Sequence, residues 1–274
     1  MDITGKTKIF GIFGFPVEHT LSPLMHNAAF KALGLDMCYL PFKVQPSDLP
    51  MAIEAIRALN ISGVNITVPH KEKVIPFLDE TDREASRIGA VNAVVNIEGK
   101  LSGYNTDGRG FVKSLEESNI TIEGKKALLV GAGGAARAIA FSLAMKGIAE
   151  IAFFDLDKEK ARGLSNAVQK TGIQCSVMNE IMSLSGFHIV INATPLGLKA
   201  DDPLPFNPKL ILPDTVVCDL IYKKTALLHK AEGMGAKTID GSGMLLWQGV
   251  LAFELWTGIK PSVDVMRNAL QSRV

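Results

Sequence analysis

The sequence has few cysteines and no long apolar run, and each of these absences excludes a class of protein. Its three cysteines, Cys38, Cys175 and Cys218, are an odd number without CxxC spacing, and each lies beside apolar residues. We therefore expect reduced core thiols in a cytoplasmic protein rather than a disulfide framework. Nowhere do about 18 apolar residues follow one another, and the N-terminus lacks the apolar core of a signal peptide, so we expect no membrane-spanning segment.

The sequence also has almost no net charge. Its formal net charge is +1 and its pI is about 7.7, and no run of lysine or arginine stands out. Such a chain has no global field to attract nucleic acid or an anionic membrane. His19 and His26 lack the spacing of metal ligands, so no metal is expected. The partners that remain are small molecules.

The length and composition suit a sizeable core. With 274 residues, of which 47% are hydrophobic, the chain is long enough for two domains. Strand-like and helix-like stretches alternate along it, which predicts an α/β fold.

A glycine cluster follows the apolar residues 127–130 and precedes an alanine-rich helical stretch. Its spacing, Gly131-x-Gly133-x-x-Ala136, is the dinucleotide-binding fingerprint with alanine at the third position. The first glycine makes the turn, the second lets the backbone approach a diphosphate, and the helix N-terminus favours the negative charge. The residues predicted to bind the cofactor here are Gly131, Ala132, Gly133, Gly134 and Ala135.

The next apolar run, residues 151–154, ends in Asp155. A carboxylate at the end of the second strand of such a unit is suited to bind the adenosine ribose. Asp155 is therefore added to the predicted cofactor-binding residues.

The N-terminal part begins with a strand-like run over residues 8–13 and continues through a polar loop into a helix over residues 22–33. Ser22 followed by Pro23 is typical of an N-cap and a first helical residue. The hydroxyl groups of Thr20 and Ser22 together, beside a helix N-terminus, also form a plausible cradle for a carboxylate. Both interpretations of Ser22 remain open on this pattern.

Two ionisable residues follow strand-like stretches. Lys71 comes just after a strand that ends in polar residues and Pro69, where ligands of open α/β sheets collect, although a solvated lysine at a helix start is the simpler interpretation. Residues 89–97 and 100–104 predict a hairpin that turns at Glu98 and Gly99. Asp107 follows the hairpin and is suited to cap the helix over residues 107–118.

Together these stretches resemble the shikimate dehydrogenase family, which includes the quinate/shikimate dehydrogenases. The resemblance keeps family order from residue 14 to residue 258. The matching stretches are Gly14-x-Pro16, residues 19–27, 65–71, 89–92, 103–108, 131–137, 192–197 and 219–222, and Gly243-Met244-Leu245-x-x-Gln248.

The resemblance implies a two-domain α/β protein with a Rossmann-type dinucleotide-binding domain, an α/β substrate domain and a cleft between them. The substrate-binding and catalytic domain would comprise residues 1–106 and 242–274, and the dinucleotide-binding domain residues 107–241. The molecule would be a monomer or a homodimer.

The resemblance also assigns roles to residues. Lys71 and Asp107 are implied as the catalytic pair. Thr20, Ser22 and Tyr222 resemble hydroxyl groups that bind the substrate carboxylate. The ligands of the ring substituents are implied to be Thr67, Asn92 and Gln248. The nicotinamide pocket would be lined by Asn192, Thr194, Leu196, Gly243 and Met244.

The cofactor expected from the sequence is NAD, with NADP as the alternative. NADP-using members of the family usually carry Asn-Arg-Thr after the second strand of this domain, whereas this chain has Asp155-Leu156-Asp157. The arginine that would hold a 2′-phosphate is missing, and two carboxylates would repel that phosphate. Lys158, Lys160 and Arg162 are a counter-argument, because one of them could fold back onto a phosphate.

The expected reaction is hydride transfer between a nicotinamide cofactor and the ring alcohol of shikimate. The family usually has serine where Thr20 stands, so quinate or a related cyclohexene acid remains open as the substrate. A quinate-preferring catabolic dehydrogenase, a non-catalytic dinucleotide sensor and a helix-rich binding module without a ligand are the alternatives.

Overall fold

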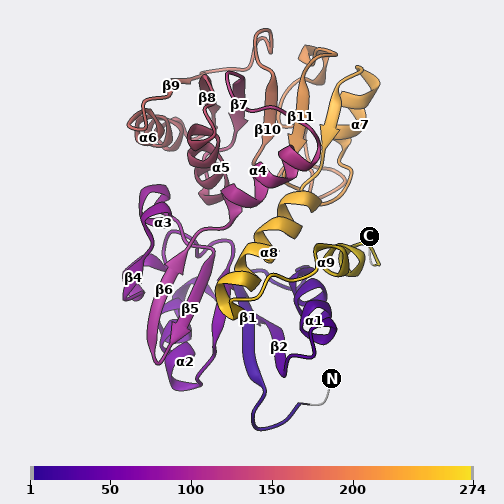
Figure 1. Cartoon of the computed structure of the whole chain (residues 1–274). Helices are drawn as coiled ribbons and strands as arrows, with labels where there is room; N and C mark the ends of the chain where they lie inside the picture. The colour runs from indigo at the N-terminus through magenta and orange to yellow at the C-terminus, as the bar shows by residue number, and fades with distance from the viewer. Residues whose placement is uncertain (1–2, 273–274) are drawn as a thin grey trace. The chain divides into compact units, whose positions relative to one another are not determined.

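The structure, a computed structural model, describes residues 3–272, and Figure 1 shows the whole chain. The chain divides into two compact units, one formed by Met1–Gly110 and Leu246–Val274 and the other by Phe111–Leu245. Both divisions fall inside helices, α4 (Asp107–Glu117) and α8 (Ser242–Thr257). The boundaries expected from the sequence, 106/107 and 241/242, lie at the beginning of the same two helices.

The first unit contains a mixed six-stranded sheet in the order β2-β1-β3-β5-β6-β4. Strands β2, β1 and β3 are parallel, whereas β5 is antiparallel to both β3 and β6. The expected hairpin is confirmed, because Glu98 and Gly99 both have positive φ angles, 52° and 87°, as a tight turn between antiparallel strands requires. The strands are β1 (Lys8–Gly14), β2 (Met37–Lys43), β3 (Gly63–Ile66), β4 (Glu80–Thr81), β5 (Ala93–Ile97) and β6 (Lys100–Tyr104).

Helices cover the two faces of this sheet. Side chains alternate along β1, so Phe13 packs with Ile53 and Ile56 of α2 while Phe10 packs with Phe30 of α1. A short 3-10 turn over Pro46–Asp48 leads directly into α2. The helices are α1 (Ser22–Ala32), α2 (Leu49–Ala58), α3 (Arg83–Ile88) and α9 (Val263–Gln271), with a further 3-10 turn over Ile75–Phe77.

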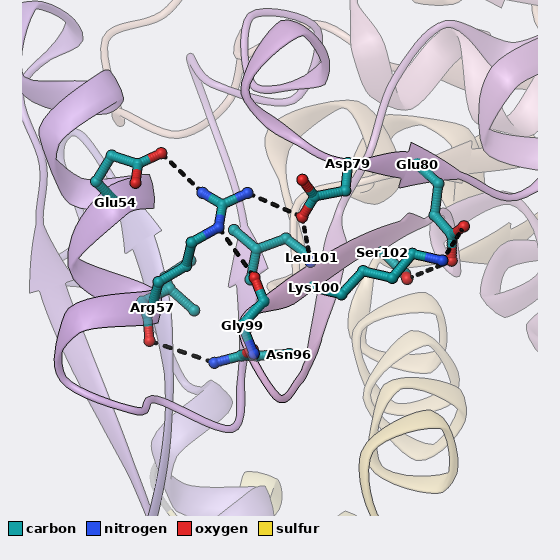
Figure 2. A network of polar contacts seen from close by, with 10 residues as sticks. Glu54, Arg57, Asp79, Glu80, Asn96, Gly99, Lys100, Leu101 and Ser102 are labelled. Atoms are coloured by element: carbon teal, nitrogen blue, oxygen red, sulfur yellow. Dashed lines mark hydrogen bonds and ion pairs between the residues drawn. The ribbon is translucent and has the colours of Figure 1, made fainter.

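A network of hydrogen bonds and ion pairs connects α2 to the β5–β6 hairpin (Figure 2). Arg57 of α2 donates to the Gly99 carbonyl at 3.0 Å and forms ion pairs with Glu54 and Asp79. Asp79 also accepts the backbone N–H of Leu101 at 2.7 Å. The Gly99 carbonyl and the Leu101 N–H thus both bond to charged side chains. Such hydrogen bonds to the backbone hold the hairpin turn in place better than exposed ion pairs alone would.

His26 lies in an aromatic cluster between α1, β2 and α8. Its ring stacks on Tyr39 with centroids 4.4 Å apart and lies parallel to the ring of Phe253. Neither ring nitrogen has a hydrogen-bond partner within residues 3–272. Burial lowers the pKa of His26 to about 3. His26 therefore has a packing role in this cluster.

We expect the His26→Phe variant to be less sensitive to acid than the wild type. Between about pH 6.5, the ordinary value for histidine, and pH 3, the unfolded chain binds a proton at this position that the folded chain does not. Stability therefore falls as the pH is lowered through this window, by at most about 1.4 kcal/mol per pH unit. Phenylalanine cannot titrate, so urea unfolding at several pH values should show a shallower loss in the variant. Equal slopes would contradict this, and His19→Phe, at an exposed position, is the control.

The second unit contains a six-stranded sheet in the order β12-β11-β10-β7-β8-β9, and every pair in it is parallel. Counted from β7, this is the 3-2-1-4-5-6 order of a dinucleotide-binding Rossmann fold, whose ligands bind where the strand order reverses. The expected fold class is confirmed. The strands are β7 (Lys126–Val130), β8 (Glu150–Phe154), β9 (Gln174–Val177), β10 (Ile189–Asn192), β11 (Val216–Asp219) and β12 (Lys237–Ile239).

Helices α5 (Gly134–Met145), α6 (Lys158–Gln169) and α7 (Ala226–Gly233), with a 3-10 turn over Pro208–Leu210, connect these strands. The central residues of β7, β8 and β10 are buried, as expected for a parallel sheet that is covered by helices on both faces. Among residues 3–272, no helix combines the length and the apolar composition that a membrane crossing needs. Of the three free thiols, Cys38 and Cys218 are buried as expected, whereas Cys175, on the edge strand β9, is only half-buried.

Candidate functional site

The first unit brings Lys71 and Asp107 into direct contact. Lys71 lies five residues past the end of β3, directly after the turn over residues 67–70, and Asp107 is the first residue of α4. The Lys71 Nζ atom lies 2.5 Å from Asp107 Oδ2. The two side chains are only 15% and 6% exposed. A pair this well removed from water is stable only if its remaining polar atoms also have partners.

Asn92 supplies such a partner. Its Nδ2 atom donates to Asp107 Oδ1 at 2.8 Å and to Thr106 Oγ1 at 3.0 Å, and its Oδ1 atom accepts the Thr106 backbone N–H at 2.7 Å. The backbone N–H of Val91 donates to the Lys71 carbonyl at 2.8 Å. Both oxygens of the Asp107 carboxylate are therefore bonded to side chains. Asp107 is engaged with Lys71 and Asn92 rather than serving only as a helix cap.

The N-cap prediction for Ser22 is wrong. Helix α1 takes Leu21 as its N-cap residue and has no side-chain cap. The Ser22 backbone N–H donates to Thr20 Oγ1 at 3.3 Å. The Ser22 hydroxyl therefore does not cap its own helix.

Gln248 and Thr67 belong to the same unit. A Cβ atom at Gly110, in the first turn of α4, would lie 2.7 Å from the backbone nitrogen of Gln248. Glycine therefore allows α8 to approach α4 within one helical turn of Asp107. Thr67 follows β3 directly, and its backbone N–H donates to the Phe13 carbonyl at 2.9 Å. The unit that holds Lys71 and Asp107 thus also holds Thr20, Ser22, Thr67, Asn92 and Gln248.

In the second unit, the glycine motif lies at the carboxyl end of β7. Gly131 has φ +108°, and a Cβ atom there would lie 2.9 Å from the Ala193 carbonyl oxygen, so this turn requires glycine. Gly133 is the N-cap residue of α5 and offers no side-chain cap to the helix. A Cβ atom at Gly133 would meet nothing within 4 Å. The N-terminal N–H groups of α5 beside an open glycine suit a diphosphate.

Asp155 follows β8 and is bonded to the same loop. Its Oδ2 atom accepts the Ala132 N–H at 2.8 Å, and its Oδ1 atom accepts the Asp157 N–H at 2.8 Å. Asp157 in turn caps α6. The carboxylate of Asp155 is therefore held at the edge of the glycine loop, and the side chain of Leu156 beside it is 87% exposed.

Asn192 and Asp219 lie opposite each other at the ends of β10 and β11. Asn192 Nδ2 donates to Asp219 Oδ1 and to the Leu196 carbonyl, both at 3.1 Å, while Asn192 Oδ1 accepts from the Thr194 hydroxyl at 2.7 Å. Asp219 also accepts from the Thr225 hydroxyl at 2.7 Å. Burial raises the pKa of Asp219. This network holds the loop that carries Thr194 and Leu196.

The remaining predicted residues also lie in the second unit. Burial raises the pKa of Tyr222, which follows the Asp219 strand end by a short turn. A Cβ atom at Gly243 would lie 2.8 Å from the Ser114 Cβ atom, so α8 and α4 approach closely there. Met244 is buried. The second unit thus holds Tyr222 and all the residues predicted to bind the cofactor.

The sequence interpretation gave no role to Asn65, Tyr39 or Thr106, although each has a polar contact in the network around Asn92 or next to it. For Asn65 the sequence did contain a signal, because it is a polar residue within an apolar strand. All four residues of that strand are buried, and buried amides require partners.

The chain matches three family models. The model described as the shikimate dehydrogenase substrate binding domain matches residues 12–94, that of shikimate / quinate 5-dehydrogenase matches residues 114–197, and that of the shikimate 5′-dehydrogenase C-terminal domain matches residues 241–271.

Individual proteins resemble it over nearly their whole length. A protein of Desulforamulus reducens named shikimate dehydrogenase (NADP(+)) is 49% identical over 99% of this chain and 97% of its own. The crystal structure of a shikimate dehydrogenase in complex with NADP+ is similar with a TM-score of 0.93 and 42% identity, covering 100% of this chain and 98% of that one. The shikimate 5-dehydrogenase of Listeria monocytogenes, crystallised with shikimate and NAD, gives a TM-score of 0.90 and 37% identity, covering 98% of each chain.

Proposed function

Because the chain belongs to the shikimate dehydrogenase family, we propose that it is an oxidoreductase that interconverts shikimate and 3-dehydroshikimate. The observation that carries this proposal is the contact of Lys71 with Asp107 at 2.5 Å, in a nearly buried position of the unit that matches the substrate-binding model. A nicotinamide cofactor supplies or removes the hydride. The remaining requirement is a group that moves the proton of the ring alcohol.

Lys71 is that group. When the alcohol is oxidised, its hydroxyl proton must leave as hydride departs from the same carbon, and the Lys71 amine accepts it. In the reverse direction the Lys71 ammonium returns the proton to the ketone oxygen. Asp107 holds Nζ in place, and Asn92 holds Asp107. Such positioned acid–base catalysis contributes about 10²–10⁴-fold to the rate.

The other residues bind the two ligands. The hydroxyls of Thr20, Ser22 and Tyr222 are assigned to the substrate carboxylate, and Thr67, Asn92 and Gln248 to the ring substituents. On the cofactor side, the N–H groups at the start of α5 suit the diphosphate. Asp155 is assigned to the ribose, and the loop with Asn192, Thr194 and Leu196, together with Gly243 and Met244, to the nicotinamide.

We further propose that NAD is preferred to NADP, although the relative from Desulforamulus reducens is named for NADP(+). The support for NAD is the fixed carboxylate of Asp155 next to an exposed leucine in place of an arginine. A ribose hydroxyl can donate to this carboxylate, whereas a 2′-phosphate would be repelled by it.

A matrix of steady-state rates tests the proposed function. Shikimate and quinate are each assayed with NAD and with NADP, and the expected highest kcat/KM belongs to shikimate with NAD. A higher kcat/KM for quinate would favour the catabolic dehydrogenase. Dinucleotide binding without turnover of either acid would favour the sensor and refute the enzyme.

We expect the Thr20→Ser variant to raise kcat/KM for shikimate relative to quinate. Serine keeps the hydroxyl that accepts the Ser22 N–H but removes one methyl group from the pocket. The effect should be modest, because one methyl group is worth about 1–3 kcal/mol of discrimination at most. An unchanged ratio between the two acids in the same assay would show that Thr20 does not set ring specificity.

A further inference from the structure

We propose that Tyr39 is a positioning residue for the Lys71–Asp107 pair, and that it acts through the side chain of Asn65. This inference rests on the proposed function, because its effect is read from turnover. The two residues lie on strands that are not neighbours: Tyr39 is on β2 and Asn65 on β3, with β1 between them.

The Tyr39 hydroxyl reaches across β1 to Asn65. Tyr39 is opposite Phe10 and Asn65 is opposite Ile12, so the two residues are offset by two positions along β1. The Tyr39 Oη atom lies 2.6 Å from Asn65 Oδ1. The tyrosine side chain is completely buried and its ring is stacked on His26. The phenol is therefore held on one side by packing and on the other by this hydrogen bond.

The hydrogen-bond directions in this cluster can be assigned completely. The carbonyl oxygen of Asn92 can only accept, so the Asn65 Nδ2 atom, 3.0 Å away, must donate to it. Asn65 Oδ1 is then an acceptor, and the single phenol proton of Tyr39 must be given to it.

The cluster ends at the reacting pair. The Asn92 carbonyl accepts from Asn65 Nδ2 and from the Ile66 N–H at 2.9 Å. The side chain of the same Asn92 bonds Asp107 Oδ1, and the other oxygen of Asp107 contacts Lys71. An unbroken chain of contacts thus runs from the Tyr39 phenol to the Lys71 amine.

Packing alone does not require these polar groups. Strand β3 is otherwise apolar and fully buried, and an apolar pair of similar shape would fill the same space without the cost of burying an amide and a phenol. What the polar pair adds is direction, because each hydrogen bond fixes the orientation of the next group. Asn65 thereby fixes the backbone of Asn92, while the Thr106 N–H that donates to Asn92 Oδ1 turns Nδ2 toward Asp107.

The test is Tyr39→Phe, which keeps the stacked ring and removes only the hydroxyl. We expect kcat for shikimate to fall about tenfold, the effect of losing one buried hydrogen bond from the chain, while the KM for the dinucleotide is unchanged. Tyr104→Phe removes a hydroxyl from a half-buried tyrosine of the same unit and should leave kcat unchanged. To separate slower catalysis from partial unfolding, kcat is expressed per dinucleotide-binding site found by titration.

A double-mutant cycle distinguishes positioning from packing. In an Asn65→Ala background, Tyr39→Phe should change kcat by less than about twofold, because the group through which it acts is already absent. The same factor in both backgrounds, or an unchanged kcat per site in the single variant, would overturn the proposal. If the double variant does not fold, the single variant decides. A wild type that does not oxidise shikimate would refute the proposed function itself, whereas an active wild type with an unaffected Tyr39→Phe variant refutes only the role of Tyr39.

Discussion

The Lys71→Ala variant is expected to lose about 10²–10⁴-fold in kcat for shikimate, because it removes the group that we propose takes and returns the proton. The KM for the dinucleotide should not change, since the residues assigned to the cofactor lie in the other unit. Steady-state rates measure both. Lys73→Ala removes an exposed lysine two residues further along the chain and should have nearly wild-type rates.

Stability must be separated from catalysis in this experiment. Without Lys71, the buried carboxylate of Asp107 loses its cation, which costs about 3–5 kcal/mol when a buried pair is broken. The double variant Lys71→Ala/Asp107→Asn removes that charge, so it should regain stability in urea unfolding and yet remain inactive. Added methylamine should partly restore turnover to Lys71→Ala. A Lys71→Ala protein with near-wild-type kcat would remove the lysine from the mechanism.

Asp107→Asn separates the two interpretations of that residue. Asparagine keeps the size of the side chain but not the negative charge that holds Lys71 Nζ. If Asp107 positions the lysine, kcat falls, and if it only begins the helix, kcat is kept. The structure favours the first outcome, because both carboxylate oxygens are bonded to side chains of other segments.

Features that depend on short stretches could be predicted from the sequence. The turn at Gly131 needs a positive φ angle, and the hairpin turn at Glu98 and Gly99 needs two, so each has a local signal. The parallel order of the second sheet also follows from a strand, glycine turn and helix that only a few topologies accommodate. At these positions the backbone conformation favours particular amino acid types, so the residues themselves indicate the turn.

Features that depend on distant segments could not be predicted. Ser22 before Pro23 is a typical N-cap by local rules, but helix α1 takes Leu21 as its N-cap residue and has no side-chain cap. The link from Tyr39 to Asn65 exists only because β1 lies between their strands with a particular register. The amino-acid sequence alone contains no signal for a hydrogen bond between side chains on two strands that are separated by a third strand.

The proposed preference for NAD depends on the charge next to the carboxyl end of β8. Asp155 is fixed by the N–H groups of Ala132 and Asp157, so its carboxylate cannot easily turn away from a phosphate bound at the ribose. Leu156, at the position where NADP-using members carry arginine, has no donor to offer. Repulsion without a compensating cation disfavours NADP.

The three cations near this strand end that could bind a 2′-phosphate have other partners. Lys158 donates to the Asn179 carbonyl at 2.9 Å and lies 4.2 Å from the centre of the Phe154 ring. Lys160 pairs with Asp157 at 3.6 Å, and Arg162 pairs with Glu159 at 2.5 Å. A 2′-phosphate would have to draw one of them from these contacts.

The decisive variant is Asp155→Asn/Leu156→Arg, which restores the Asn-Arg pair of NADP-using members. It removes the repelling charge and adds a guanidinium that can bind a phosphate in a bidentate manner. We expect the wild type to have the higher kcat/KM with NAD, and the ratio of kcat/KM for NADP to that for NAD to rise at least about tenfold in the variant, for one charge-assisted hydrogen bond gained. Asp214→Asn/Leu212→Arg makes the same charge change at exposed positions of the same unit, so it controls for long-range electrostatics and should leave the ratio unchanged. A wild type that favours NADP would refute the preference, and an equal shift in both double variants would mean that overall charge, rather than a contact at the β8 strand end, selects the cofactor.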